Sequence, residues 1–495
     1  MKKYKRIIFH IIILFTVIIL TGCEMKEVFG EGPVVPVTVT PTPSADKQFR
    51  IVDSGPNYGG SLILPASGEI DSLNPYFTKN RHVIYIASFI YESLFVNSGE
   101  NDIEPWLVAD WDHEGFLTWE FTLKENVTFH GGQEFTAYDV RHTLRVIENS
   151  DSPFYYTDIL NDIEEFEIIS RMRFIIKLKK PDTSFIKKLV FPILSQSAEF
   201  QNQDIVSGTG PFCFEGMDEI TVSLKKNDNW WYEGLPYFDS VIFRIMPENK
   251  IIDAFQNNEI DIAFVKNIDF SKLRYRTNLE YQVYPDNEFN LLYVNPKSLF
   301  GKENRQEALF RYIAYRIHDI NLEEVQYFEQ YGGGFINADE FRDELINSGL
   351  QWNRDKKVFI ENGRALSTLY VLVPERDMQK LHTANFIVNI LEDVGIPAAI
   401  RTNTPQNVIR AIRNGNYDLS PVTQELKPWE SLDDALRRMQ DELGYGKEHS
   451  YILPLYRNQQ ATLFKNYIRG EKKSSFWNPY YGFHAWYMPL FERGE

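Results

Sequence analysis

One short stretch in the first third of the chain places a strand, a glycine turn and a capped helix in direct succession. Leu117–Lys124 alternates between apolar and polar side chains, which predicts a strand with one buried face. Gly131 and Gly132 predict a turn, because glycine adopts positive φ at little cost. Thr136 stands three residues before Asp139, a variant of the capping box, and apolar residues follow at helical spacing. This order favours a fold that mixes helices with sheets.

The same stretch contains His130, a residue type that could belong to a metal site. No second histidine follows it at i+2 or i+4, and His142 lies twelve residues further on. No Gly-Lys-Ser/Thr element is present to hold a phosphate. We therefore predict that His130 is a hydrogen-bonded structural residue and that the stretch is architecture rather than a catalytic centre.

Strand-like and helix-like runs alternate along the rest of the chain. Strands are predicted at Phe174–Leu178, Val241–Ile245 and Leu291–Val294, and a helix at Leu381–Val394, with Gly395 just after its end. A chain of 495 residues is too long for one hydrophobic core, so two or three domains are expected. The alternation predicts α/β lobes.

Net charge and cysteine content exclude several classes of function. The formal charge is −17, and the sequence shows no basic stripe, so a nucleic-acid partner is excluded. The two cysteines, Cys23 and Cys213, are too few for a disulfide framework or a cysteine-rich zinc site. Cys213 lies in the strand-like sequence Phe212–Phe214 and is predicted to be a small buried hydrophobe.

The N-terminus has the pattern of a secretory signal. A basic start precedes an apolar run, residues 7–20, that leads into Leu-Thr-Gly-Cys ending at Cys23. A helix of that length spans about 21 Å, less than the ~30 Å of a bilayer core, so a cleaved signal fits better than a stable span. The ending resembles the bacterial lipobox, which implies a signal peptide of residues 1–22 and an acylated Cys23. Residues 23–57, rich in Pro, Thr and Val, would form the anchor and a flexible tether.

Residues 103–144 carry a long ordered motif, IEPWLVADWDHEGFLTWEFTLKENVTFHGGQEFTAYDVRHTL. This block resembles the family 5 extracellular solute-binding proteins, the oligopeptide, dipeptide and nickel receptors of ABC importers. Further blocks match the family in the same order: Tyr58–Leu62, Leu73–Pro75, Tyr91–Leu94, Ser207–Phe212, Asn229–Asp239, Asn258–Asp261 and Asn414–Asp418. The resemblance covers nearly all of residues 58–495.

The resemblance implies a periplasmic-binding-protein-like clamshell of two α/β lobes with an inserted α/β subdomain. Gly208 and Gly210 would lie where strands pass between the lobes and would act as hinge residues, because glycine absorbs backbone rotation at low cost. The implied boundaries are residues 58–98, 205–288 and 461–495 for lobe I, residues 99–204 for the inserted subdomain, and residues 289–460 for lobe II.

The resemblance also implies a function. A ligand would be captured between the lobes and delivered to the permease subunits of an ABC importer, without catalysis. The chain would be a lipid-anchored monomer at the extracytoplasmic face of the bacterial cell membrane. Its ligand would be a peptide or another small solute, with no cofactor, metal or nucleic acid. Binding would stabilise the closed state only by the difference between its affinities for the closed and open states.

The segment that should bind a peptide's amino terminus departs from the family pattern. Many members use an aspartate in a Gly-Trp-x-x-Asp segment at this point. Here residues 419–434 read LSPVTQELKPWESLDD, with Lys427 or a neighbour at the aspartate position. Without that carboxylate, a free amine loses a charge-assisted hydrogen bond of roughly 1.5–3 kcal/mol. Glu425 and Trp429 are the nearest candidates for ligand contact, and Asn74 is a third candidate from the opening loop.

Other functions remain open at this stage. An enzyme is disfavoured, because the sequence has no HExxH pair and no Gly-x-Ser-x-Gly element. A ligand sensor or adhesin without transport would use the same scaffold. A receptor for a nickel complex is another alternative, although His82, His113 and His142 lack ligand spacing. The aromatic segment Phe476–Tyr487 invites an oligosaccharide ligand, but strand packing of a closing segment is the favoured interpretation.

Overall fold

The computed structural model describes residues 49–51, 55–99, 102–150, 155–197, 206–266, 279–322, 325–328, 334–443, 451–489 and 491–493. The chain divides into two compact units, residues 1–50 with 493–495, and residues 51–492. The predicted signal peptide (1–22), Cys23 and nearly all of the predicted tether (23–57) lie outside the described residues. No helix within the described ranges has the length and apolar character of a membrane span.

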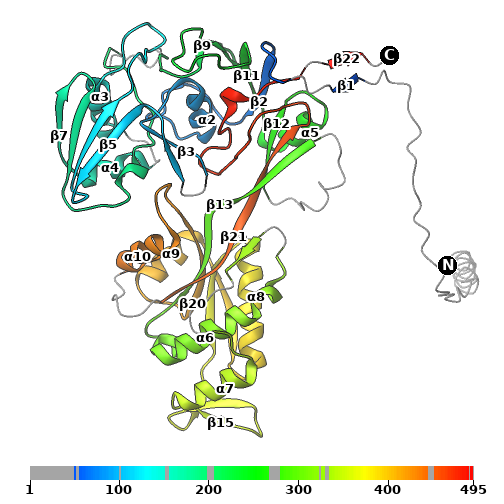
Figure 1. The fold of residues 1–495 in the computed structure, drawn as a ribbon. Helices are drawn as coiled ribbons and strands as arrows, with labels where there is room; N and C mark the ends of the chain where they lie inside the picture. Colours follow the sequence, from blue (N-terminus) through cyan, green and yellow to red (C-terminus); the bar gives the residue numbers. More distant parts are fainter. Residues whose placement is uncertain are drawn as a thin grey trace, which may run out of the picture. The chain divides into compact units, whose positions relative to one another are not determined.

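The structure describes the first unit only in strands β1 (Phe49–Ile51) and β22 (Phe491–Arg493). One residue of β1 and two residues of β22 belong to the second unit. The other helices and strands that the structure describes belong to the second unit, residues 51–492 (Figure 1).

A four-stranded sheet begins the second unit. Its order is β2-β11-β10-β9, with β2 parallel to β11 and the other neighbours antiparallel. The strands are β2 (Ser61–Ala66), β9 (Phe212–Met217), β10 (Thr221–Lys226) and β11 (Ser240–Ile245), and the nearby helices are α2 (Arg81–Ile90) and α5 (Ile251–Gln256). Asn80 caps α2 by accepting the amide N–H of His82, and the apolar face of α2 is buried.

A second four-stranded sheet, of order β5-β6-β8-β7, is antiparallel throughout. The predicted strand is β6 (Thr118–Leu123), and its residues alternate between buried and half-buried as expected. The predicted capping box is also confirmed, because the Asp139 carboxylate accepts both the amide N–H and the hydroxyl of Thr136 at the start of α3. The remaining elements here are β3 (Phe95–Asn97), β4 (Ile103–Pro105), β5 (Val108–Glu114), β7 (Ile163–Ser170), β8 (Arg173–Leu178), α3 (Ala137–Glu148), α4 (Asp158–Asp162), η1 (Tyr155–Thr157) and η2 (Phe185–Lys188).

The largest sheet has seven strands in the order β12-β21-β13-β20-β18-β19, with β14 paired to β21. Two of its strands are long, β13 (Leu279–Val294) with 16 residues and β21 (Ile452–Lys465) with 14. They run side by side between the earlier sheets and the helices that follow (Figure 1). Their register shifts between Pro285 and Phe289, which marks a β-bulge midway along β13.

Helices cover the distal part of this sheet. The predicted helix is α8 (Met378–Asp393), followed by Gly395 at φ +90°, as the sequence indicated. The other elements are α6 (Glu303–Arg316), α7 (Ala338–Asn347), α9 (Pro405–Arg413), α10 (Leu432–Glu442), β12 (Ile262–Lys266), β14 (Val325–Tyr327), β15 (Gln351–Asn353), β16 (Val358–Glu361), β17 (Arg364–Ala365), β18 (Leu369–Pro374), β19 (Ala398–Asn403) and β20 (Leu419–Glu425), with short 3-10 turns η3 (Glu248–Lys250), η5 (Leu299–Gly301), η6 (Ile317–Ile320) and η7 (Phe483–Ala485).

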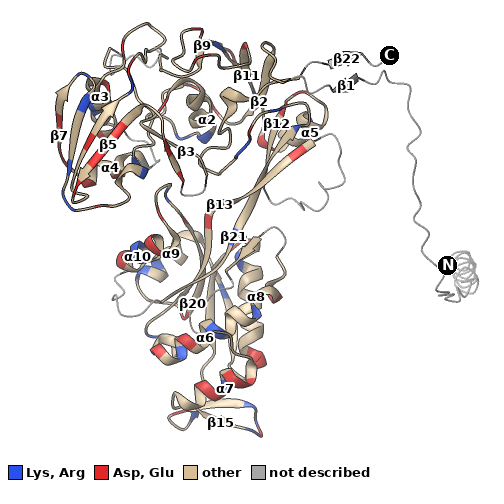
Figure 2. Ribbon diagram, in the orientation of Figure 1, with Lys and Arg blue, Asp and Glu red and all other residues tan. Residues whose placement is uncertain are grey.

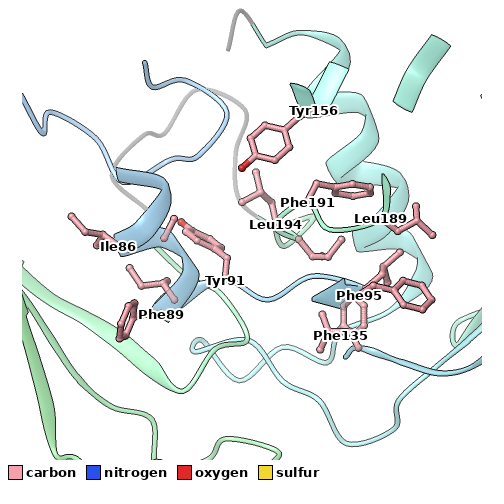
Figure 3. Packing of buried hydrophobic residues seen from close by; sticks show 14 of the residues in the cluster. Ile86, Phe89, Tyr91, Phe95, Phe135, Tyr156, Leu189, Phe191 and Leu194 are labelled. Atoms are coloured by element: carbon pink, nitrogen blue, oxygen red, sulfur yellow. The ribbon is translucent and has the colours of Figure 1, made fainter. Parts of the chain in front are cut away.

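The buried residues form separate hydrophobic clusters. The largest combines α2, the two four-stranded sheets and the C-terminal segment, and Figure 3 shows part of it, including Phe89, Tyr91, Phe95, Phe191 and Leu194. Two further clusters draw only on residues 289–456. The mixed α/β class predicted from sequence is therefore confirmed, whereas the exact lobe boundaries stay predictions.

Candidate functional site

The opening stretch is architectural, as predicted. The Nε2 atom of His130 lies 2.9 Å from the carbonyl oxygen of Gly210, and its Nδ1 accepts the amide N–H of Gly208 at 3.4 Å. Burial lowers the pKa of His130, although the hydrogen bond to Gly210 opposes that effect. A neutral ring that bridges two backbone positions is a structural histidine.

The two predicted hinge glycines lie against the end of α2. The amide of Gly210 donates to the carbonyl of Ile90 at 2.8 Å, and Asn227 donates to the Gly210 carbonyl at 3.0 Å. A Cβ atom on Gly208 would lie 1.9 Å from the Ile90 carbonyl oxygen, and one on Gly210 would lie 2.6 Å from it. Close backbone approach is thus sufficient to require glycine here, and the hinge role stays a prediction.

Asn74 uses its side chain within its own turn. Its Oδ1 accepts the amide N–H of Tyr76 at 3.0 Å, and its own amide donates to the hydroxyl of Ser72 at 3.1 Å. This arrangement accounts for Asn74 by local structure, and its predicted ligand contact stays untested.

Glu425 ends β20 and carries an exposed side chain. It faces Glu288 across the β13–β20 pair, and its Oε2 lies 3.5 Å from the side-chain nitrogen of Asn287. Burial raises the pKa of Glu288, and the nearby Asp286 and Glu425 carboxylates raise it further, against Lys266 and Lys380. Two like charges opposite each other on paired strands repel.

The loop after Glu425 is held rigidly. Glu430 is buried and accepts two hydrogen bonds from the Arg438 guanidinium, at 2.7 and 3.0 Å. The same carboxylate accepts the amide N–H of Lys427 at 3.1 Å. Arg438 also donates to the Glu425 carbonyl at 3.1 Å, so the guanidinium ties both ends of the loop to α10.

Two side chains of this loop contact residues of α4 and η2, in the part of the chain that also forms the β5-β6-β8-β7 sheet. The Lys427 ammonium forms an ion pair with Asp158 of α4 at 2.7 Å. The Lys188 ammonium lies 6.0 Å from the centre of the Trp429 ring, a cation–π distance. Sequence reasoning placed Trp429 and Glu425 as candidates but missed Lys427 as a contact residue, because its partner lies far away in sequence.

A cavity of about 120 Å³ is lined in part by residues of the same two segments that contact the loop. Its wall includes Tyr156 and Val190, which lie two residues in sequence from Asp158 and Lys188, respectively. Aromatic side chains dominate the rest of its lining, with contributions from α2, β3 and the C-terminal segment: Tyr85, Tyr91, Phe95, Trp106, Trp230, Trp477, Tyr481, Phe483 and His484. An aromatic lining with a few convergent polar groups is typical of a small-ligand site, although such sites usually have volumes of about 300–1,000 Å³.

Glu92 is the one acidic residue in the wall of this cavity. It is 5% exposed, and its carboxylate accepts indole N–H groups from Trp106 at 2.7 Å, Trp230 at 3.0 Å and Trp231 at 3.0 Å. The Lys124 ammonium lies 4.3 Å from the Trp231 ring centre. Burial raises the pKa of Glu92 to about 7, while the indole hydrogen bonds favour its ionised form.

The raised pKa of Glu92 predicts a pH-dependent stability. Because the folded-state pKa lies above the usual 4.5, the folded protein holds a proton that the unfolded chain releases between about pH 4.5 and 7. The stabilising contribution is therefore full below pH 4.5 and is lost as pH rises through 7. We expect the difference in unfolding free energy between wild type and Glu92→Gln to change by about 1–3 kcal/mol over this range. Urea denaturation at several pH values would measure it, and parallel pH profiles for the two proteins would contradict it.

The C-terminal aromatic segment packs as predicted but not as a strand. Tyr480 and Trp486 are almost fully buried, and Phe483 lies in the short turn η7. Its only strand-like pairing among the described residues is the single bridge between Tyr487 and Arg469. The strand prediction is wrong, because the buried residues recur every three or four positions rather than every second one.

The prediction for Cys213 also needs correction, since its side chain is half-buried.

The fold defines the class of protein. The structure resembles that of HbpA2 from Haemophilus parasuis, with a TM-score of 0.71 at 15% identity, covering 87% of this chain and all of that one. This likeness identifies the α/β fold of periplasmic binding proteins, as the sequence predicted.

The sequence comparisons point to one family. The model of "Bacterial extracellular solute-binding proteins, family 5 Middle" matches residues 102–314. The nickel-binding periplasmic protein of Escherichia coli (strain K12) is 25% identical over 209 residues, which is 39% of each chain. The glutathione-binding protein GsiB of Salmonella paratyphi A is 27% identical over 213 residues, 41% of this chain and 42% of that one.

The matched segments thus span about two-fifths of the length of these curated relatives. Family match and relatives thus point to the family 5 solute-binding proteins, as the resemblance in the sequence did, and the fold is consistent with them. Both named relatives are binding proteins, one for nickel and one for glutathione.

Proposed function

We propose that this chain is the extracytoplasmic substrate-binding protein of an ABC importer, which captures a peptide or another small solute and delivers it to a membrane permease. The observation that carries the proposal is the aromatic cavity, taken together with the contacts of the loop after β20. The cavity wall contains Tyr156 and Val190, and the loop contacts Asp158 and Lys188, which are two residues away in sequence, so one ligand could reach both. Such a convergence of an apolar pocket with charged groups suits a small amphipathic molecule.

The proposed lobes keep the boundaries that the family resemblance implies. Lobe I would comprise residues 58–98, 205–288 and 461–495, with the inserted subdomain at 99–204 and lobe II at 289–460. Closure would bend the long strands β13 and β21, and the bulge at Pro285–Phe289 is the natural place for that bend, because the ladder is already interrupted there. Gly208 and Gly210 would then anchor the inserted subdomain on α2 in addition to any hinge role.

The proposed location is the extracytoplasmic face of the bacterial cell membrane. Cys23, at the end of a signal-like segment, would carry the lipid, and residues 23–57 would tether the folded body. The partners would be permease subunits and the membrane, with the binding protein itself a monomer. Radiolabelled palmitate incorporation that is lost in Cys23→Ala would support this anchor.

A peptide is the first candidate ligand. The glutathione-binding relative supports a small peptide, and aromatic walls accommodate varied side chains. An oligosaccharide is the second candidate, because the faces of aromatic residues in the cavity also suit the apolar face of a sugar ring.

Tryptophan fluorescence tests this proposal directly. Trp106, Trp230 and Trp477 line the cavity, so a ligand that enters it should shift or quench their emission. We expect saturable changes on titration with a mixed tripeptide library and a response reduced by at least half in Trp106→Phe. A saturable response to cello- or chito-oligosaccharides instead would favour the second candidate. No response to either class would contradict binding at the cavity.

A further inference from the structure

We propose that Lys427 is a specificity-determining residue. Its ammonium group already pairs with Asp158. The end of the ligand that binds near the loop after β20 is therefore uncharged or anionic rather than a free amine. N-acylated peptides are the ligand class that this predicts. The inference deepens the proposed function and rests on it for the ligand, but the Lys427–Asp158 pair can be tested separately.

The position of Lys427 is fixed on both sides of the loop. Its backbone N–H bonds to Glu430, and Glu430 is in turn held by Arg438 of α10. Its side chain reaches Asp158 at 2.7 Å, with the two side chains only 30% and 32% exposed. The loop holds Lys427 in place, and the ion pair is half-buried. Water and salt therefore screen its two charges less than those of a fully exposed pair, and each charge acts more strongly on a ligand group nearby.

Three carboxylates around this contact already have a cation from the chain. Asp158 pairs with Lys427, while Asp162 and Asp182 both accept from Lys188 at 2.7 Å. A ligand amine could pair with one of these three only by displacing a lysine. It would also meet two ammonium groups, so a charged amino terminus is disfavoured.

A neutral ligand end avoids this cost. An acylated amino terminus has no charge, and its amide can hydrogen-bond without displacing Lys427. Its apolar acyl group or first side chain can enter the neighbouring aromatic cavity, whose wall includes Tyr156 and Val190. The charged residues around the loop and α10 can be followed in Figure 2.

The specificity experiment uses the full-length protein in detergent and an equimolar library of tripeptides, each present with a free and with an N-acetylated amino terminus. Retained peptides are quantified by mass spectrometry. We expect acetylated forms to be enriched at least about fivefold over their free partners on the wild type, which corresponds to about 1 kcal/mol. Lys427→Met, which leaves Asp158 without its cation, should bring the ratio below one, and Lys427→Asp should lower it further.

The matched control is Lys356→Asp, which makes the same charge change at an exposed turn between β15 and β16. It should leave the wild-type preference intact. Enrichment of free-amine peptides on the wild type, or an unchanged ratio in Lys427→Asp, would overturn the inference.

A double-mutant cycle tests the ion pair without any ligand. Thermal unfolding of Lys427→Met, Asp158→Asn and the double variant should show that the second substitution has less than half its single effect once the first is present. Additive effects would overturn the pairing. If the cycle shows coupling while the library shows no retained peptide of either form, the pair stands and the peptide assignment of the proposed function fails.

Discussion

Replacement of Glu92 by leucine should be the most destabilising single substitution considered for this chain, with an expected loss of about 3–5 kcal/mol in unfolding free energy. The carboxylate is the common acceptor for the indole N–H groups of Trp106, Trp230 and Trp231, which come from two separate segments of the chain. Leucine would leave these three donors buried without their acceptor. Each such donor costs about 1–3 kcal/mol, and the losses do not add fully.

A glutamine at position 92 separates the effect of the hydrogen-bond geometry from the effect of the carboxylate charge. Glu92→Gln keeps a carbonyl oxygen that can accept two of the three indole groups, so we expect less than half the loss caused by leucine. Urea denaturation followed by tryptophan fluorescence measures both variants, and the indoles report on their own environment. Equal stability of wild type and Glu92→Leu would mean that the three hydrogen bonds do not hold the subdomain to α2.

Alanine at Gly208 should also be strongly destabilising. Its Cβ would lie 1.9 Å from the carbonyl oxygen of Ile90 and 2.9 Å from the Cα of Tyr91, and neither backbone atom can move without shifting the end of α2. Overpacking of this kind typically costs about 1–3 kcal/mol, and contact with rigid backbone places this case at the upper end.

Gly216 offers a matched control. It lies in β9, and a Cβ added there would meet no heavy atom within 4 Å. Gly216→Ala should therefore leave the melting temperature nearly unchanged, while Gly208→Ala lowers it. If Gly208 were instead only a hinge, its alanine variant would keep wild-type stability and change ligand affinity alone. Calorimetry with and without ligand distinguishes these outcomes.

Local features could be predicted from sequence because their causes are local. The alternation of β6, the Thr136–Asp139 cap of α3 and the glycine after α8 each depend on residues a few positions apart. His130 was interpreted as structural by elimination, and its backbone partners at Gly208 and Gly210 confirm that interpretation.

The candidate site could not be predicted in the same way because its partners are distant in sequence. Glu92 lies 14 residues from Trp106 but 138 from Trp230, and only the fold brings the three together. Lys427 and Asp158 are likewise paired by topology alone. The family resemblance pointed to the loop after β20 but named Glu425 and Trp429, whereas Lys427 makes the ion pair.

The sequence of the C-terminal segment contains a spacing of aromatic residues that contradicts the predicted strand. Phe476, Tyr480, Phe483 and Trp486 are buried and recur at intervals of four, three and three. That spacing contradicts a strand, in which every second residue would be buried. A count of the spacing would have predicted the irregular, inward-facing segment that lines the cavity.

Native mass spectrometry of the protein purified from its host most directly tests whether this chain captures a small molecule and releases it unchanged. We predict a population heavier than the ligand-free protein by the mass of one small solute, which dissociates intact when the protein is unfolded. A protein that carries no such ligand after growth in rich medium, or a bound molecule recovered in chemically altered form, would contradict the account.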